Sequence, residues 1–128
     1  MENEIVLLDT SILIDYYRKK DKSKSVLFTL SNKYSIFAVS SITQFEIYIG
    51  AKNEQIDFWD AFFQEITVLP FNSETSVIAV KIDLDLKSKR KQISIPDLFI
   101  AATALSNNLP CATLNKKHFE RIADLVLL

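Results

Sequence analysis

Residues 5–8 form an uninterrupted apolar run, and Asp9 follows it directly. A strand with apolar side chains at every position is typical of a parallel sheet that is covered by helices on both faces. Further short apolar runs alternate with longer segments of helical periodicity, which indicates repeated strand–helix–strand units. We therefore expect an α/β fold, namely a three-layer α/β/α sandwich around a mostly parallel sheet of roughly five strands.

Capping residues and breaks in the apolar pattern predict where these elements begin and end. A single glycine and three prolines leave no flexible linker, so we expect one domain over residues 1–128. Ser41 and Gln44 have the spacing of a capping box, and Asn72 or Ser73 caps a long helix that ends near residue 90. The expected strands are 5–8, 36–39, 66–69, 111–114 and 125–128, and the other expected helices are 11–19, 24–32, 55–64 and 96 to about 107.

The composition argues against a secreted or membrane-bound protein. No apolar run approaches the roughly 18 residues of a membrane span, and the first residues carry acids where a signal peptide carries positive charge. The only cysteine, Cys111, lies in an apolar run and is expected to be a small core residue. We expect a cytoplasmic protein that does not enter membranes.

The charged residues are balanced overall but grouped along the chain. A net charge of −1 gives no general attraction for nucleic acid. Each basic run can be a solvated helix end, or it can hold a phosphate backbone near an acidic centre. The three runs are Arg18, Lys19, Lys20, Lys22 and Lys24; Lys87, Lys89, Arg90 and Lys91; and Lys116, Lys117, His118 and Arg121.

Asp9 is the first of three acids in unusual places. It follows a buried strand, and ligands of parallel α/β sheets bind outside the carboxyl ends of the strands. The pattern therefore indicates a functional carboxylate. The alternative is a structural aspartate that caps the next helix.

Glu46 is the second such acid. On the helix that begins near Ile42 we expect an apolar stripe through Phe45 and Ile49, and Glu46 falls within this stripe. A buried glutamate is unfavourable unless it is paired or bound to a metal. The alternative is an edge position from which the carboxylate reaches solvent.

Asp97 is the third. It lies in the first turn of a helix after Pro96, three and four residues before the inward-facing Ile100 and Ala101. The alternative is an ordinary first-turn acid that interacts with the helix dipole.

Three carboxylates in one crevice would repel each other and raise each other's pKa values. A hard divalent cation removes this conflict, and oxygen ligands suit Mg²⁺ or Mn²⁺. The chain has no Cys/His set for zinc. We therefore expect Asp9, Glu46 and Asp97 to hold a hard divalent cation together.

Four segments resemble the conserved blocks of a PIN domain, and more narrowly those of the VapC ribonuclease toxins. They are LLDTSILIDYYR at 7–18, SSITQFEIYIGA at 40–51, IPDLFIAATAL at 95–105 and ATLNKKHFERI at 112–122. The resemblance implies an α/β/α sandwich, dependence on Mg²⁺ or Mn²⁺, and cleavage of structured RNA, commonly tRNA. It also implies a homodimer that is inhibited by a VapB-type antitoxin, with which it can form a higher assembly.

The resemblance also assigns site residues. Asp9, Glu46 and Asp97 match the family's metal-site acids, Thr10 or Ser11 matches a hydroxyl of the first block, and Thr113 and Asn115 match the fourth block. Many relatives carry a fourth acid near the Asn115 position, and this chain does not. We therefore expect one firm metal site, with a second filled only when RNA phosphate contributes oxygens. Lys116, Lys117 and His118 are expected to contact RNA.

The single histidine excludes a ribonuclease mechanism with two imidazoles. We therefore predict metal-assisted hydrolysis in which Asp9 and Asp97 hold the cation and Glu46 binds it or orients the attacking water.

Three other classes of protein share features with this sequence. A phosphorelay receiver needs an acid after the third strand, where the chain has Leu69 and Pro70. A haloacid-dehalogenase-type phosphatase needs a second aspartate at position 11, which is Ser11. The remaining alternative is a catalytically weak PIN module that acts mainly by binding RNA or a partner.

Overall fold

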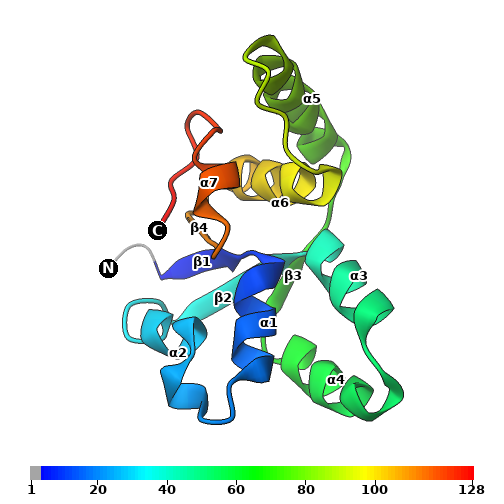
Figure 1. Ribbon diagram of the computed structural model, residues 1–128, viewed down its shortest axis with the longest axis vertical. Coiled ribbons are helices and arrows are strands. Elements are labelled where there is room, and N and C mark those ends of the chain that lie inside the picture. Colours follow the sequence, from blue (N-terminus) through cyan, green and yellow to red (C-terminus); the bar gives the residue numbers. More distant parts are fainter. Residues whose placement is uncertain (1–3) are drawn as a thin grey trace.

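The computed structural model describes residues 4–128, in which four parallel strands form one sheet between two layers of helices (Figure 1). Residues 1–3 lie outside the described part, and with them Glu2, one of the acids behind the expected absence of a signal peptide. The strands follow the order β3-β2-β1-β4. They are β1 (Ile5–Leu8), β2 (Ile36–Ser40), β3 (Thr67–Leu69) and β4 (Cys111–Ala112).

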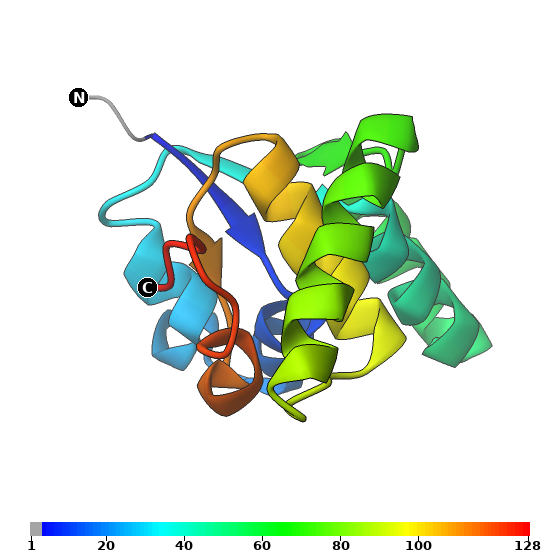
Figure 2. The same ribbon diagram turned by 90° about the horizontal axis from the view of Figure 1, so that it is seen from above.

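The helices divide between the two faces of the sheet, which Figure 1 shows edge-on, and Figure 2 looks down onto one of these faces. The face with α1 to α4 carries α1 (Thr10–Arg18), the 3-10 helix η1 (Lys22–Lys24), α2 (Val26–Leu30), α3 (Ser41–Gly50), η2 (Asn53–Gln55) and α4 (Ile56–Gln64). The other face carries α5 (Ser73–Ser88), α6 (Ile95–Ser106) and the short α7 (Lys116–Phe119). The predicted three-layer α/β/α sandwich is confirmed.

The central strand β1 explains why the chain forms two cores. Its side chains alternate, so Leu7 packs with α5, α6 and α7, whereas Val6 and Leu8 pack with α1 to α4. All three are completely buried. A strand covered on both faces must be apolar at every position, which is the pattern of residues 5–8.

The sheet has four strands, and the expected fifth strand at 125–128 is reduced to a single bridge between Leu127 and Cys111. The reason is the length of β4. After Ala112 the chain leaves the sheet, because Thr113 turns to bond Asp9, so only Cys111 remains for the C-terminal segment to pair with.

Two predicted helix starts differ in outcome. Asn72 caps α5 as expected, since its Oδ1 accepts a hydrogen bond from the Thr75 N–H at 3.0 Å. The capping box at Ser41 is wrong: Ser40 caps α3 by accepting from the Ile42 N–H, and the Ser41 hydroxyl accepts from the Phe71 N–H instead. Ser41 therefore ties the start of α3 to the end of β3.

Cys111 is a core residue, as predicted. Its side chain is completely buried, and burial, followed by the charges of Asp9 and Asp97, raises the pKa of its thiol. Within residues 4–128 no helix combines the length and the apolar composition that crossing a lipid bilayer requires.

Lys22 holds the end of α1 in an arrangement that makes it unusually important for stability. Its Nζ donates to the carbonyl oxygens of Tyr16, Tyr17 and Lys19 at 2.7, 2.9 and 2.8 Å. The same ammonium lies 5.1 to 5.7 Å from the ring centroids of Tyr16, Tyr17 and Phe58. These are the unpaired carbonyls of a helix end, which a cation stabilises.

Lys22→Met is therefore expected to lower the free energy of unfolding by about 1–3 kcal/mol, because the carbonyls lose a charged donor. Urea unfolding followed by circular dichroism measures this change. Lys24→Met is the matched control, because Lys24 is exposed two residues further along. Equal stability of the two variants would contradict the role assigned to Lys22.

Candidate active site

The candidate site lies where the connections of the sheet diverge. The chain passes from β1 to β2 on one side, whereas β4 returns to pair with β1 on the other. Leu8 pairs with Ala112 at the carboxyl ends of these strands, and the Asp9 N–H donates to the Ala112 carbonyl at 2.9 Å. Such a switch point is where parallel α/β sheets bind ligands.

Asp9 is fixed there by three donors. Its Oδ2 accepts from the Ser11 N–H at 3.4 Å, the Ser11 hydroxyl at 2.7 Å and the Thr113 hydroxyl at 2.7 Å. The residue is only 2% exposed, yet no described group bonds its Oδ1, and no fully buried polar atom lacks a partner in residues 4–128. Oδ1 therefore opens onto the crevice. Asp9 both caps α1 and offers a free carboxylate oxygen.

The segment after β4 is held against α1 by the same hydroxyls. The Leu114 N–H donates to Ser11 Oγ at 3.0 Å, and the Asn115 N–H donates to Thr113 Oγ1 at 2.9 Å. Ser11 and Thr113 therefore hold the Asp9 carboxylate in position. Both residues are among those that the sequence assigned to the site. Asn115 contributes its backbone, and its side chain is exposed.

Glu46 points toward the same end of the molecule from α3. Its Oε1 accepts from the Thr10 hydroxyl at 2.7 Å, and Thr10 Oγ1 is also 2.9 Å from Thr43 Oγ1. Thr10 directly follows Asp9, so one short segment contacts both acids. Glu46 is partly buried.

The stripe that led to Glu46 is wrong. Phe45 and Ile49 are 63% and 72% exposed, and the buried residues of α3 are Thr43 and Ile47. Glu46 adjoins this other face, three residues after Thr43. The hydrophobic residues of α3 mislead because two of them are on the surface.

Asp97 approaches from the start of α6. Ser94 caps this helix by accepting from the Asp97 N–H, and the Asp97 side chain is 16% exposed. Burial and, second, the charge of Asp9 raise the pKa of Asp97, while His118, whose Nδ1 lies 3.3 Å from Asp97 Oδ2, opposes the shift together with Ser94. The two aspartates therefore feel each other's charge.

The three acids are not yet one cluster. Among residues 4–128 no three carboxylate, imidazole or thiol groups lie close enough together to hold a metal ion as they stand. Asp9 and Asp97 are electrostatically coupled, and Glu46 is linked to them through Thr10. Every donor that faces this region from Asp9, Glu46, Asp97 and the neighbouring hydroxyls is an oxygen, a set that fits Mg²⁺ or Mn²⁺.

Two contacts of the site were not predicted from the sequence. Thr43 is completely buried beside Thr10, and its spacing of three residues from Glu46 on one helix was the available signal. His118 contacts Asp97 across 21 residues, and no sequence spacing indicates this pair.

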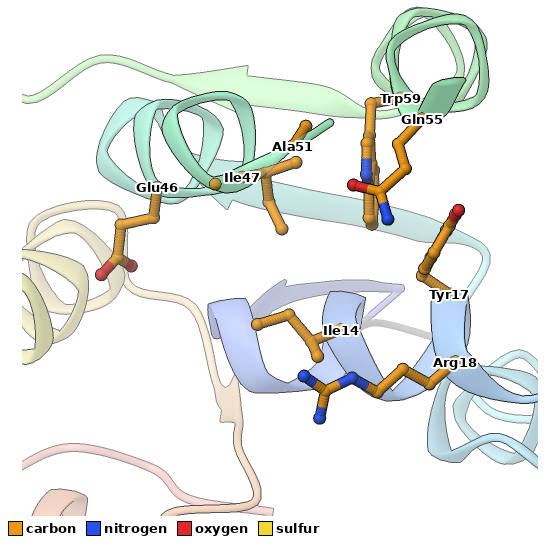
Figure 3. Close-up of a pocket in the computed structure, with 9 residues that line it drawn as sticks. Ile14, Tyr17, Arg18, Glu46, Ile47, Ala51, Gln55 and Trp59 are labelled. Atoms are coloured by element: carbon orange, nitrogen blue, oxygen red, sulfur yellow. The ribbon is translucent and has the colours of Figure 1, made fainter. Parts of the chain in front are cut away.

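A cleft leads from Glu46 along α1 and α3 (Figure 3). Its walls include Ile14 and Tyr17 of α1, Ile47 of α3 and Trp59 of α4, and Arg18 lies on the α1 side. Apolar and polar side chains therefore share the walls of the cleft, and a carboxylate lies at one end.

The parallel sandwich carries a buried aspartate after its central strand and, on α6, a second aspartate that the charge of the first one affects. These features define an α/β domain with acidic side chains at the carboxyl end of its sheet. The PIN domain family model matches residues 6–125. The chain belongs to the PIN domain family and, within it, to the VapC ribonucleases.

Relatives and solved structures agree with this assignment. The chain is 35% identical to Ribonuclease VapC1 of Methanocaldococcus jannaschii, with 98% of this chain and 87% of the relative covered. It is 34% identical to Ribonuclease VapC of Rickettsia bellii, with 96% and 94% covered. The fold matches the crystal structure of VapBC2 from Rickettsia felis bound to a DNA fragment from their promoter, with a TM-score of 0.84, 27% identity and 97% of each chain covered.

Proposed function

We propose that this VapC-type ribonuclease cleaves structured RNA by Mg²⁺- or Mn²⁺-dependent hydrolysis and acts as a growth-inhibiting toxin. The observation that carries the proposal is the held Asp9, with one carboxylate oxygen free and the charge of Asp97 beside it. Two close carboxylates whose charges disfavour each other become favourable when a cation lies between them.

Asp9 and Asp97 would hold the cation, and Glu46 would complete the site or orient water. When bound, a divalent cation supplies charge stabilisation for the phosphate and lowers the pKa of water. Ser11 and Thr113 keep Asp9 Oδ2 occupied, so Oδ1 remains the oxygen available for binding. Because Asn115 stands where a fourth acid would be, a second cation would need RNA phosphate oxygens.

Hydrolysis assigns roles to Glu46 and to the basic residues of α7. Glu46 orients a water whose oxygen attacks the phosphorus in line with the leaving 3′ oxygen. The bond from phosphorus to that 3′ oxygen breaks. The attacking water loses one proton, and the leaving oxygen takes up one proton, so the step balances. Lys116, Lys117 and His118, exposed on α7 beside Asp97, would hold the phosphate backbone.

This scheme predicts that the purified protein cleaves total tRNA in Mg²⁺ and that EDTA removes the activity. Excess MgCl₂ or MnCl₂ should restore it, because only oxygen donors are involved. Water attack leaves 5′-phosphate and 3′-hydroxyl ends, which an exonuclease specific for 5′-phosphates detects. Products with a 2′,3′-cyclic phosphate, or cleavage in EDTA, would contradict the scheme.

We also propose that a VapB-type antitoxin inhibits the protein through the cleft of Figure 3. The Rickettsia felis structure is a VapBC complex bound to DNA. In this chain, the cleft beside Trp59 offers both apolar and polar walls to a polypeptide segment, and Glu46 at its end suits a cationic side chain. A segment in the cleft would thereby reach a residue of the proposed site.

A homodimer belongs to the same proposal. Val77, Val80 and Leu84 lie on one face of α5, and each is more than half exposed (55%, 54% and 61%). Contiguous exposed apolar side chains typically mark an interface. Higher assembly with antitoxin would then join such dimers.

A catalytically weak module that only binds RNA or a partner is the second candidate. It is favoured by Asn115 in place of an acid and by the absence of a three-group cluster within the described residues. Tight binding of tRNA without any Mg²⁺-dependent cleavage would select this candidate.

A further inference from the structure

Two basic runs that are far apart in the sequence meet on one surface. The Arg121 guanidinium, just after α7, donates to the Gln92 carbonyl at 3.0 Å and reaches the Lys91 carbonyl at 3.5 Å. These carbonyls belong to the loop between α5 and α6. Arg121 therefore fastens this loop beside α7 and brings both basic runs together.

Two adjoining depressions run across this surface and share Lys117. The inner depression is lined by Thr113, Leu114, Asn115, Lys116, Lys117 and His118. The outer depression is lined by Arg90, Lys91, Lys117, Glu120 and Arg121. Since Thr113 bonds Asp9, the surface begins at the proposed site and leads outward to Arg90.

The cations of this surface differ from their neighbours in their pairing. Lys87 and Lys89 lie 3.0 Å from Asp83 and Asp85, respectively. By contrast, no carboxylate of residues 4–128 lies within 4.0 Å of the cationic nitrogens of Arg90, Lys91, Lys116, Lys117 or Arg121. Glu120 is the one acid among the lining residues of the outer depression.

Arg90 occupies a backbone conformation that normally favours glycine. Its φ is 57°, and the next residue, Lys91, donates its N–H to the Leu86 carbonyl at 2.9 Å to end α5. Glycine satisfies this helix end without a side chain in the left-handed region. An arginine at this position is less favourable than glycine, which makes its side chain a candidate for a functional role.

We propose that Arg90, Lys91, Lys116, Lys117 and Arg121 form a basic strip that binds the RNA backbone to one side of the cleaved phosphate. The proposal deepens the ribonuclease function and rests on it for the identity of the ligand. RNA is favoured over a protein partner because the outer depression has no apolar lining residue, whereas protein interfaces have apolar centres.

The test compares two double variants with the same loss of charge at the same end of α5. Arg90→Gly with Lys91→Gln removes two cations of the strip, and the glycine suits the left-handed φ, so the thermal midpoint should not fall. Lys87→Gln with Lys89→Gln removes two paired cations as the control. Binding of fluorescein-labelled bulk bacterial tRNA is measured by anisotropy in EDTA over a series of KCl concentrations.

The strip variant is expected to bind about tenfold more weakly, and its slope of log K against log[KCl] should fall by about 1.4 to 1.8, the value for two phosphate contacts. The control should change little. Equal binding by both variants, or no tRNA binding by the unchanged protein, would overturn the proposal. Weakened binding of a poly-glutamate peptide but not of tRNA would overturn it in favour of an acidic protein ligand.

Cleavage is measured separately, so the two proposals can fail independently. If the unchanged protein cleaves tRNA and the strip variant binds and cleaves like the control, only the strip is wrong. If tRNA binding depends on the strip but no cleavage occurs in Mg²⁺, the strip stands and the hydrolytic function fails.

Discussion

Glu46→Gln is expected to lower the rate of RNA cleavage by about 10²–10⁴-fold. This corresponds to about 3–5 kcal/mol of activation free energy. Glutamine has nearly the shape of glutamate and can still accept the Thr10 hydroxyl bond at Oε1, so the geometry around Thr10 is kept. What is lost is the negative charge that binds a cation or orients water. Single-turnover cleavage of tRNA measures the effect.

Glu54→Gln is the matched control. It makes the same chemical change as Glu46→Gln, but at an exposed residue of η2 away from the site. It should retain full activity. A Glu46→Gln protein that cleaves within tenfold of the unchanged protein would remove Glu46 from the proposed chemistry.

The aspartates should behave likewise, with a further signature at Asp97. Burial and the charge of Asp9 raise the pKa of Asp97, so the folded protein is less stable above this pKa than an ordinary aspartate would leave it. Asp97→Asn should abolish cleavage because it removes a carboxylate of the proposed cation site. It should not lower the thermal midpoint in EDTA at neutral pH, because the unfavourable buried charge is removed as well. In Asp9→Asn, the retained oxygen can still accept from Ser11 and Thr113.

Phe119→Ala is expected to lower the free energy of unfolding by about 3–5 kcal/mol, because it empties a filled site in the core. Phe119 is completely buried and has the largest volume among the fully buried side chains of the described residues. It packs in the core between the sheet, α5 and α6. Total stabilities are only about 5–15 kcal/mol, so the loss is large.

Phe119 also anchors α7 to the core. Helix α7 has four residues, too few to be helical alone, and Phe119 is its one buried side chain. Urea unfolding gives the change in free energy, with Phe45→Ala as the control because Phe45 is 63% exposed. A loss below about 1 kcal/mol would contradict the anchoring role, since buried Phe-to-Ala changes cost several times more.

The parts of the fold that could be predicted are those that depend on local pattern. The apolar run before Asp9 predicts a doubly covered strand, and Asn72 predicts a helix cap, because both signals lie within a few residues. The capping box at Ser41 fails for a tertiary reason: its hydroxyl is used by Phe71. The fifth strand fails because Thr113 draws the chain out of the sheet.

The site shows the same division. Asp9 could be placed from its strand alone, whereas Glu46 was singled out by a stripe that does not exist in the structure. Its orientation depends on Thr10, 36 residues away. The meeting of Arg121 with Gln92 likewise depends on packing between separate helices, which periodicity does not encode.

The bond between Thr113 and Asp9 has a consequence for when the protein can become active. It joins residues 104 positions apart, the first strand to the last. A growing polypeptide therefore lacks this support for Asp9 until almost all of the chain has been synthesised. The closure of so long a loop is also a late event in folding. The positioning of Asp9 in the candidate site is thus a property of the nearly complete chain.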